Sequence, residues 1–327
     1  MKNKLTAVLA ASALIATGCT AENNIPDEAV PQITTNLQTI TEISVEAEIA
    51  QEEIKMEQFK DTIVELMPSE YEEKREGVKY SEFQKLTYFS SAAGRDTNVN
   101  VMLPPDYSEE KEYPVLYILH GFYDNEDWMT RPAVNFGTIY GNLLAEGNAK
   151  EMIIVLPYIF CDKNMPYCTG MDLANCYAYD NFINDLTTDL MPFIESCFSV
   201  AKGRENTAIT GFSMGGRESL FIGYERPDLF GYIGAVCPAP GLVEIPNSPM
   251  HPGQMTAEEM IFADDKPFIL LVSSSEIDGV VGSSPDDYRR IMKGNQVEFL
   301  SHVMKTTGHD HSSVKPHLYN FLQLLFK

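Results

Sequence analysis

One hexapeptide constrains the fold of this chain more than any other feature. Residues 211–216 read Gly-Phe-Ser-Met-Gly-Gly and contain the pattern G-x-S-x-G. The apolar residues 207–210 before it predict a buried parallel strand, and residues 217–224 after it predict a helix. A serine between glycines in a sharp strand-to-helix turn is a nucleophile elbow, which exposes the hydroxyl at the carboxyl edge of the sheet. Because the five-residue pattern also recurs by chance in glycine-rich loops, the flanking strand and helix carry the prediction that Ser213 is a nucleophile.

An elbow serine needs a general base, which in this architecture follows the serine and an acid along the chain. His309 lies in a glycine-containing loop just past a predicted strand, where open α/β sheets place their chemistry. We therefore predict His309 as the base, with His311 as the second choice. The other histidines after Ser213 lie in a Pro/Gly loop, inside a predicted strand and inside the predicted final helix, where structural roles are expected: His251, His302 and His317.

The acid of such a triad is expected at the end of the preceding strand. Residues 267–272 form a continuous apolar run, which is typical of a strand covered on both faces. Two carboxylates follow it, Glu276 and Asp278. Either can accept the far ring N–H of the histidine and stabilise the imidazolium without taking its proton. These residues alone leave the choice of acid open.

The negative charge that develops on the substrate oxygen needs two backbone donors. The N–H of Met214, directly after the nucleophile, is the first. The second is expected where the apolar run 113–119 breaks into His-Gly, because Gly121 lets the backbone approach a substrate closely. We predict the N–H of Phe122 as this donor. His120 precedes the nucleophile in the chain, and we expect it to stabilise the turn rather than act as a base.

Several segments together resemble carbohydrate esterase family 1, the feruloyl and acetylxylan esterases. They occur in the order and with the spacing of that family between residues 78 and 327, and residues 315–322 resemble its final helix. The segments that carry the resemblance are Leu116–Gly121, Asp127–Trp128, Ile153–Pro157, Gly211–Gly216 and Gly308–Asp310.

The resemblance implies an α/β-hydrolase fold, with a mostly parallel central sheet flanked by helices. A strand pattern on both sides of Gly94 adds an antiparallel hairpin at the start of the sheet. The triad becomes Ser213, Asp278 and His309, because residues 278–282 are similar to the acid loop of the family. The implied activity is that of a serine carboxylesterase, which removes ferulate or related hydroxycinnamates from plant xylan through an acyl-enzyme.

Other functions remain open at this level. An acetylxylan or other short-acyl esterase shares every catalytic residue, a transacylase requires only that water be excluded, and a catalytically dead surface carbohydrate-binding protein requires none of the chemistry. Trp128, Tyr158 and Phe160 follow strands or the oxyanion loop and are candidates to line an acyl pocket, although Trp128 is equally well explained as a core or lid residue. The cysteine-rich insertion at residues 161–176 departs from the family and leaves substrate preference open.

The amino terminus predicts export. Residues 1–19 combine a basic start, an apolar core and a small-residue site, and resemble a bacterial lipoprotein signal in which Cys19 becomes lipidated; an ordinary signal peptide is the alternative. The apolar core is too short for a permanent span. Residues 20–76 read as an acidic tether, followed by an esterase domain at 77–327. Within the tether, apolar residues at helical spacing predict one amphipathic helix: Met56, Phe59, Ile63, Leu66 and Met67.

Cysteines and fingerprints argue against a cofactor or a metal. The chain contains no P-loop, no G-x-G-x-x-G after a strand and no H-E-x-x-H. Export permits disulfides. We expect a disulfide between two of Cys161, Cys168 and Cys176 rather than a zinc site, because that segment contains no histidine. Cys197 and Cys237 lie in apolar surroundings and are expected as small core residues.

The net charge of the chain limits the classes of molecule that it is expected to bind. The net charge is −23 at pH 7. Such a chain repels nucleic acid phosphates, and it also lacks the basic character that an esterase of anionic iron–siderophore complexes needs. A neutral or weakly charged polysaccharide ester of the plant cell wall is the expected substrate, with a membrane contacted only through the lipid at Cys19.

Overall fold

The computed structural model describes residues 58–244 and 251–327. The chain divides into two compact units, residues 1–51 and 52–327, and every described residue belongs to the second. The predicted signal, the lipidation site Cys19 and the tether up to residue 57 lie outside the described residues.

The second unit is built on one eight-stranded sheet with the strand order β1-β2-β4-β3-β5-β6-β7-β8. β1 and β2 form an antiparallel hairpin, β2 pairs antiparallel with β4, and the remaining neighbours are parallel. This confirms the predicted mostly parallel sheet with an antiparallel hairpin at its start. The strands are β1 Gln84–Ser90, β2 Arg95–Met102, β3 Val115–Leu119, β4 Ile153–Pro157, β5 Thr207–Gly211, β6 Tyr232–Val236, β7 Ile269–Ser275 and β8 Leu300–Met304.

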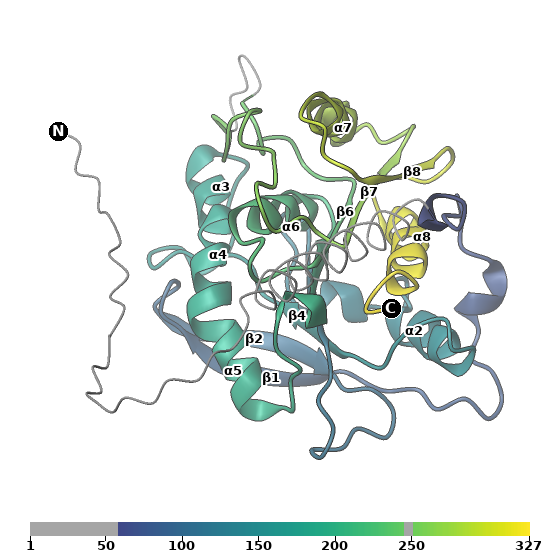
Figure 1. Ribbon diagram of the computed structural model, residues 1–327. Helices are drawn as coiled ribbons and strands as arrows, with labels where there is room; N and C mark the ends of the chain where they lie inside the picture. The colour runs from purple at the N-terminus through teal and green to yellow at the C-terminus, as the bar shows by residue number, and fades with distance from the viewer. Residues whose placement is uncertain (1–57, 245–250) are drawn as a thin grey trace, which may run out of the picture. The chain divides into compact units, whose positions relative to one another are not determined.

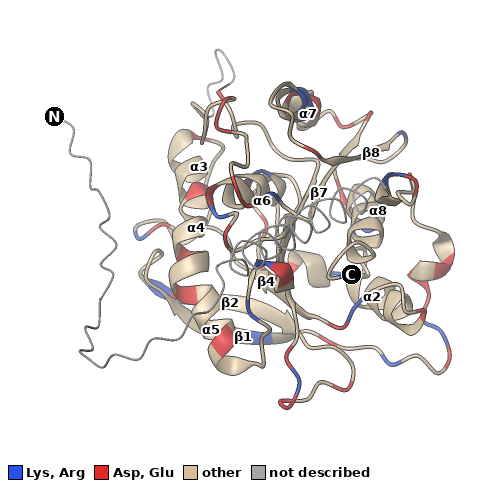
Figure 2. Ribbon diagram, in the orientation of Figure 1, with Lys and Arg blue, Asp and Glu red and all other residues tan. Residues whose placement is uncertain are grey.

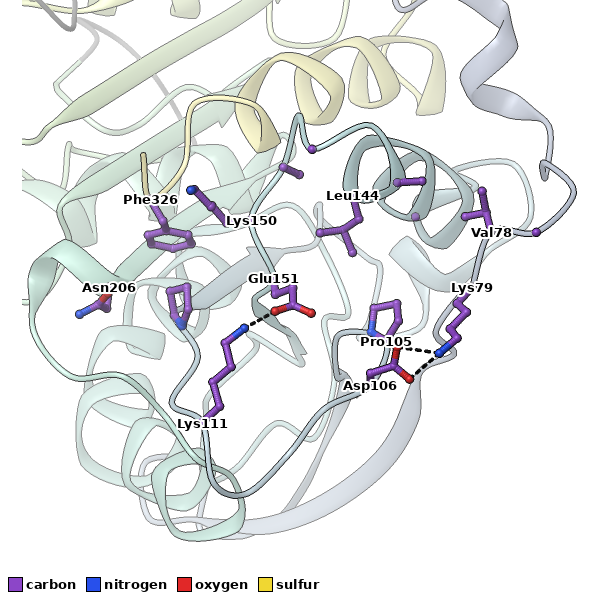
Figure 3. A pocket seen from close by; sticks show the side chains of 16 residues that line it. Val78, Lys79, Pro105, Asp106, Lys111, Leu144, Lys150, Glu151, Asn206 and Phe326 are labelled. Atoms are coloured by element: carbon purple, nitrogen blue, oxygen red, sulfur yellow. Dashed lines mark hydrogen bonds and ion pairs between the residues drawn. The ribbon is translucent and has the colours of Figure 1, made fainter.

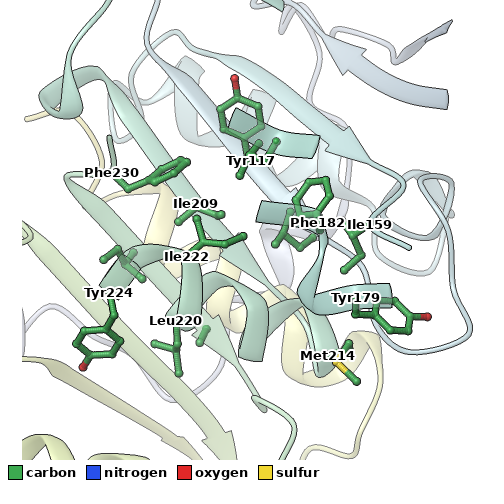
Figure 4. Close-up of a cluster of buried hydrophobic side chains, with 14 of the residues drawn as sticks. Tyr117, Ile159, Tyr179, Phe182, Ile209, Met214, Leu220, Ile222, Tyr224 and Phe230 are labelled. Atoms are coloured by element: carbon green, nitrogen blue, oxygen red, sulfur yellow. The ribbon is translucent and has the colours of Figure 1, made fainter. Parts of the chain in front are cut away.

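Helices cover both faces of the sheet, which explains why the central strands are apolar along their whole length. In β3, Tyr117 faces a core under α3 to α7, whereas Leu116 and Ile118 face a second core under α2 and α8 (Figure 1). Figure 4 shows part of the first core, where side chains of β3, β5 and α6 meet. The helices are α2 Phe136–Ala145, α3 Leu173–Asp180, α4 Phe182–Asp185, the π-helical turn η3 Leu186–Leu190, α5 Met191–Cys197, α6 Met214–Glu225, α7 Ser284–Gly294 and α8 His311–Leu322.

The residues before the first strand form an amino-terminal strap (residues 58–76) that lies on the domain. Asn320 of α8 accepts the N–H of Val64 at 3.1 Å and donates to its carbonyl at 2.8 Å. The ring of His302 is hydrogen-bonded to the carbonyl of Glu65 at 2.9 Å, and Tyr71 is buried. Of the predicted amphipathic helix only residues 58–60 are helical among those described, yet its apolar members Phe59, Ile63 and Met67 do pack against the second core.

The strap is therefore part of the folded unit, and we expect it to stabilise the domain. A chain that begins at residue 77 lacks Ile63 and Tyr71, and it therefore exposes the part of the second core that these side chains cover. It also loses the hydrogen bonds to His302 and Asn320. Burial of side chains of this size predicts a loss of about 3 kcal/mol, or about 6–12 °C in Tm for a domain of this size. Thermal unfolding followed by circular dichroism compares the chains that begin at residues 52 and 77. Equal Tm values would contradict a stabilising strap.

The pairing and burial of the cysteines differ in part from expectation. The five cysteines in the described part of the chain are free, so no pair forms among Cys161, Cys168 and Cys176. Cys237 is buried as expected, but the expectation for Cys197 is wrong, because this residue at the end of α5 is exposed.

Acidic residues are spread over helices and loops (Figure 2). No helix among residues 58–244 and 251–327 is long and apolar enough to span a membrane.

Candidate active site

The predicted elbow connects β5 to α6. Ser213 has φ 57° and ψ −113°, a backbone conformation that residues with a side chain rarely adopt. Neighbouring backbone fixes it: the Ser213 N–H donates to the carbonyl of Val236 at 3.0 Å, and the N–H of Ala239 donates to the Ser213 carbonyl at 2.9 Å. The serine is thus held at the carboxyl end of the sheet, at a strain that its surroundings maintain.

The glycines of the motif are required by close backbone approach. A Cβ atom at Gly211 would lie 2.3 Å from the carbonyl oxygen of Gly215. A Cβ atom at Gly215 would lie 2.4 Å from the carbonyl oxygen of Leu119 in β3. Any larger residue would push α6 away from β3 and β5, so the spacing G-x-S-x-G records the packing of three elements.

The structure joins Ser213, His309 and Asp278 by hydrogen bonds in that order. Nε2 of His309 lies 2.9 Å from Oγ of Ser213, and its Nδ1 lies 2.7 Å from Oδ2 of Asp278. The other carboxylate oxygen, Oδ1, accepts the backbone N–H groups of Val280 at 2.9 Å and Val281 at 3.3 Å. Asp278 is thereby oriented with one oxygen turned to the histidine.

The charge on Asp278 sets the tautomer of the histidine. Burial raises the pKa of Asp278, but the hydrogen bonds from His309 and the two backbone N–H groups outweigh burial and hold the pKa below its ordinary value. The carboxylate is therefore ionised at neutral pH and can only accept. The proton of neutral His309 lies on Nδ1, and the lone pair on Nε2 faces the serine hydroxyl, as a general base requires.

The other candidates for the acid and the base make different contacts. Glu276 is exposed on the loop after β7. His251 is hydrogen-bonded to Asp180 at 2.7 Å. The rings of His302 and His317 both contact the Ser273 hydroxyl inside the sheet, and burial lowers the pKa of each. His311 begins α8, two residues after the histidine that contacts the serine.

Two aromatic side chains pack in series against the ring of His309. The ring of Phe212 lies 4.6 Å from the ring of His309, and Trp128 stacks on Phe212 with centroids 5.0 Å apart and an interplanar angle of 10°. Trp128 is 8% exposed. Of its two interpretations from the sequence, the structure matches the core residue, since Phe212 lies between it and the histidine.

His120 fixes the peptide that precedes the second predicted oxyanion donor. Its Nε2 accepts the N–H of Ile159 at 3.1 Å, so its Nδ1 carries the proton and donates to the carbonyl of Gly121 at 2.8 Å. Burial lowers the pKa of His120 to about 4, which keeps the ring neutral. Because this peptide is trans, the N–H of Phe122 points away from the carbonyl that His120 holds.

The two predicted donors lie on segments that flank the serine. Met214 is the first residue of α6, so its N–H has no acceptor within the helix. A Cβ atom at Gly121 would lie 3.5 Å from Cβ of Ser213, which places the Gly121–Phe122 peptide beside the nucleophile.

The two remaining candidates for the lining of an acyl pocket differ in their exposure. Tyr158 is half-buried, stacks on His120 with centroids 5.5 Å apart and borders a surface groove. Phe160 is 1% exposed and packs against Tyr179 in the first core. Phe160 therefore presents no surface to a substrate in this structure.

Cys237, which the sequence predicted only as a small core residue, lies next to the site. Its Sγ lies within 4.8 Å of ligand atoms of Asp278 and His309, a set that could in principle hold a metal. Burial raises the pKa of Cys237 to about 12, and the adjacent Asp278 adds to that rise. Zinc binds cysteine as the thiolate. A protonated thiol beside a hydrogen-bonded Asp–His pair fits a metal site poorly.

A pocket of about 860 Å³ lies at the opposite edge of the sheet (Figure 3). Pro114, Glu151 and Asn206, which precede β3, β4 and β5, line it. Ion pairs join Lys111 to Glu151 and Lys79 to Asp106 within it. It belongs to the amino ends of the strands, whereas Ser213 and His309 lie at the carboxyl ends.

Comparisons with known proteins agree with the fold and the site. The Esterase family model, described as "Putative esterase", matches residues 90–321. A ferulic acid esterase of carbohydrate esterase family 1 from Anaeromyces mucronatus, solved in complex with ferulic acid, is 41% identical with a TM-score of 0.76, over 81% of this chain and 97% of that chain. A feruloyl esterase module from Clostridium thermocellum, complexed with sinapinate, shares the fold with a TM-score of 0.64 at 19% identity, over 80% and 93% of the two chains.

Curated relatives are longer proteins. The endo-1,4-beta-xylanase/feruloyl esterase of Xylanibacter ruminicola is 31% identical over 166 residues, which is 49% of this chain and 22% of that relative. The endo-1,4-beta-xylanase Y of Acetivibrio thermocellus is 27% identical over 171 residues, or 14% of its length. The chain thus spans less than a quarter of these relatives. With an elbow on an α/β-hydrolase sheet and a family match over most of its length, the chain belongs to the Esterase family and to carbohydrate esterase family 1, and is a carboxylic ester hydrolase.

Proposed function

We propose that this protein is an exported serine esterase that hydrolyses hydroxycinnamoyl esters, above all feruloyl esters, of plant xylan. One observation carries the proposal: its 41% identity over 97% of an esterase solved with ferulic acid bound. The hydrogen-bonded series Ser213, His309 and Asp278 supports it, because this arrangement activates a serine for acyl transfer.

The geometry supports a two-step mechanism. Oγ of Ser213 attacks the ester carbonyl carbon while Nε2 of His309 takes the hydroxyl proton, and Asp278 stabilises the imidazolium. The N–H groups of Met214 and Phe122 stabilise the oxyanion, each contributing about 3 kcal/mol to the barrier reduction. The C–O bond to the sugar then breaks, and His309 returns the proton to the departing alkoxide.

Hydrolysis of the acyl-enzyme repeats these roles. A water molecule gives its proton to His309 and adds to the acyl carbonyl, and the second oxyanion collapses with release of the free acid. The proton on His309 returns to Oγ of Ser213, so the enzyme ends in its starting protonation state.

Exposed apolar side chains beside the site suit an aromatic acyl group. Ile277 and Val280 flank Asp278 in the acid loop and are 64% and 65% exposed. Apolar surface of this kind favours a flat hydroxycinnamoyl ring over acetate, because burial of apolar area is the main source of affinity for such a group.

We test the activity with initial rates of the full-length chain on methyl ferulate and 4-nitrophenyl acetate. We expect methyl ferulate to be the better substrate by kcat/KM, with ferulic acid identified as the product by chromatography. Cleavage of the acetate alone would make the enzyme a short-acyl esterase. Activity on neither ester would contradict the proposal.

Export rests on the sequence of residues 1–19. We expect the protein in its host to fractionate with membranes and to incorporate labelled palmitate. A Cys19→Ala variant is expected to lose the label, because the thioether to the lipid needs the cysteine sulfur. Unchanged membrane fractionation and labelling in that variant would contradict lipidation at Cys19.

A further inference from the structure

A polar groove of about 400 Å³ borders the predicted oxyanion loop. Residues 95–98 of β2 form one wall, and residues 123–126, directly after Phe122, form the second. Residues 166–168 of the cysteine-rich insertion form the third, together with Tyr158. Its volume lies within the range of roughly 300–1,000 Å³ that is usual for small-ligand sites.

The inner end of the groove lies beside the nucleophile. Oδ2 of Asp124 lies 3.6 Å from the position that a Cβ atom at Gly121 would take, and that position is 3.5 Å from Cβ of Ser213. The N–H of Asp124 donates to the carbonyl of Gly121 at 3.3 Å, so the same turn places the carboxylate and the Phe122 peptide. A ligand in the groove therefore reaches the edge of the reaction centre.

The lining of the groove suits a ligand rich in hydroxyl groups. Asp96, Asp124 and Glu126 supply carboxylates, and asparagine amides lie between them. Carboxylates and amides can accept from neighbouring sugar hydroxyls. Tyr123 and Tyr167 are 55% and 63% exposed, and each offers a ring face on which the C–H face of a sugar can stack.

The charges of the groove favour a neutral ligand. Arg131 lies 3.4 Å from Asp124, and Lys85 lies 2.9 Å from Glu126, so these two carboxylates are held in place. Arg95 also lines the groove, so its three carboxylates face three basic side chains, and no excess of positive charge is left to attract phosphate or uronate groups. Its polar walls also suit the hydroxycinnamoyl ring poorly, which leaves the alcohol side of the ester as the part that fits.

The insertion presents Tyr167 on a loop that is tied to the sheet. The guanidinium of Arg95 in β2 donates to the carbonyl of Asp162 at 2.5 Å and to the carbonyl of Pro166 at 3.3 Å. Oδ1 of Asp162 in turn accepts the N–H groups of Asn164 and Met165 at 2.7 and 2.8 Å. The segment that departs from the family thus forms a fixed wall of the groove.

We propose that this groove binds the neutral pentose residues on the leaving-group side of the ester, with Tyr167 and Asp96 as specificity-determining residues. The proposal rests on the proposed function, because it names the part of the substrate that this groove takes. Both side chains are exposed, so their replacement does not threaten the core.

The first test compares two substrates in the full-length chain. For Tyr167→Ala and Asp96→Asn we expect KM for a feruloylated arabinoxylo-oligosaccharide to rise about 10-fold, the equivalent of ~1.4 kcal/mol. The kcat/KM for methyl ferulate should stay within 2-fold, because methanol does not reach the groove. Tyr177→Ala is the matched control, since Tyr177 is 50% exposed on α3 and does not line the groove.

The second test does not depend on turnover. Isothermal titration calorimetry measures the binding of an unesterified arabinoxylo-oligosaccharide, and we expect Tyr167→Ala to weaken it while Tyr177→Ala does not. Equal binding by all three proteins would overturn the proposal, as would equal losses on methyl ferulate and the oligosaccharide. A failure of the proposed function is recognised separately, by the absence of ferulate release from the unmutated chain.

Discussion

The Ser213→Ala variant is expected to lose kcat on methyl ferulate by roughly 10⁶-fold. The substitution removes only Oγ, the atom that lies 2.9 Å from Nε2 of His309. Alanine keeps the Cβ atom, so the backbone strain at φ 57° is the same in both proteins. The two backbone hydrogen bonds of the elbow also remain. The variant should therefore fold as the unmutated chain does while lacking its nucleophile.

A buried serine on the same helix provides the matched control. Ser219 lies in α6, and its Oγ donates to the carbonyl of Gly215 at 2.7 Å without contacting His309. We expect Ser219→Ala to retain activity within a few-fold and to lose about 1 kcal/mol of stability with its hydrogen bond. Thermal unfolding verifies the fold of both variants. Residual activity of Ser213→Ala within 100-fold of the unmutated chain would mean that another group is the nucleophile.

The elbow could be predicted because the residue types that it requires stand within one short segment of the chain. Gly211 and Gly215 stand where backbone atoms of adjacent elements leave no space for a side chain, and such a need appears directly in the sequence. The apolar strands β3, β4, β5 and β7 were visible for a similar reason, since helices on both faces remove polar residues from them. Sequence therefore sufficed to locate these strands and the turn that carries Ser213.

Other features depend on contacts between distant segments. β6 reads Tyr-Ile-Gly-Ala-Val and was not identified, because its central Gly234 weakens the strand pattern. The structure gives the reason for the glycine: a Cβ atom there would lie 2.6 Å from Oγ1 of Thr210 in β5. The strap, the Phe212–Trp128 stack and the groove also join segments far apart in the chain, and no local pattern encodes such contacts.

The choice between Glu276 and Asp278 shows the same limit. The two carboxylates are two residues apart on one loop, and no periodicity distinguishes them. The structure separates them by burial: Glu276 is exposed, whereas Asp278 is 7% exposed and hydrogen-bonded to His309 and to two backbone N–H groups. Only the resemblance to the family favoured Asp278 in advance.

The Asp278→Asn variant is expected to lower kcat by about 10⁴-fold. Oδ1 accepts two backbone N–H groups, so an asparagine will keep its carbonyl oxygen there and turn its amide nitrogen toward Nδ1 of His309. An amide nitrogen donates, and the ring must then accept at Nδ1 and carry its proton on Nε2. In that tautomer the ring donates toward Ser213 and can no longer take its proton, and the imidazolium loses its neighbouring charge.

Glu276→Gln removes the same charge from the same loop and is the matched control. Because Glu276 is exposed, we expect its kcat to stay within 2-fold of the unmutated chain, which separates the hydrogen bond to His309 from a general electrostatic effect. A larger loss in Glu276→Gln than in Asp278→Asn would transfer the role of the acid to Glu276.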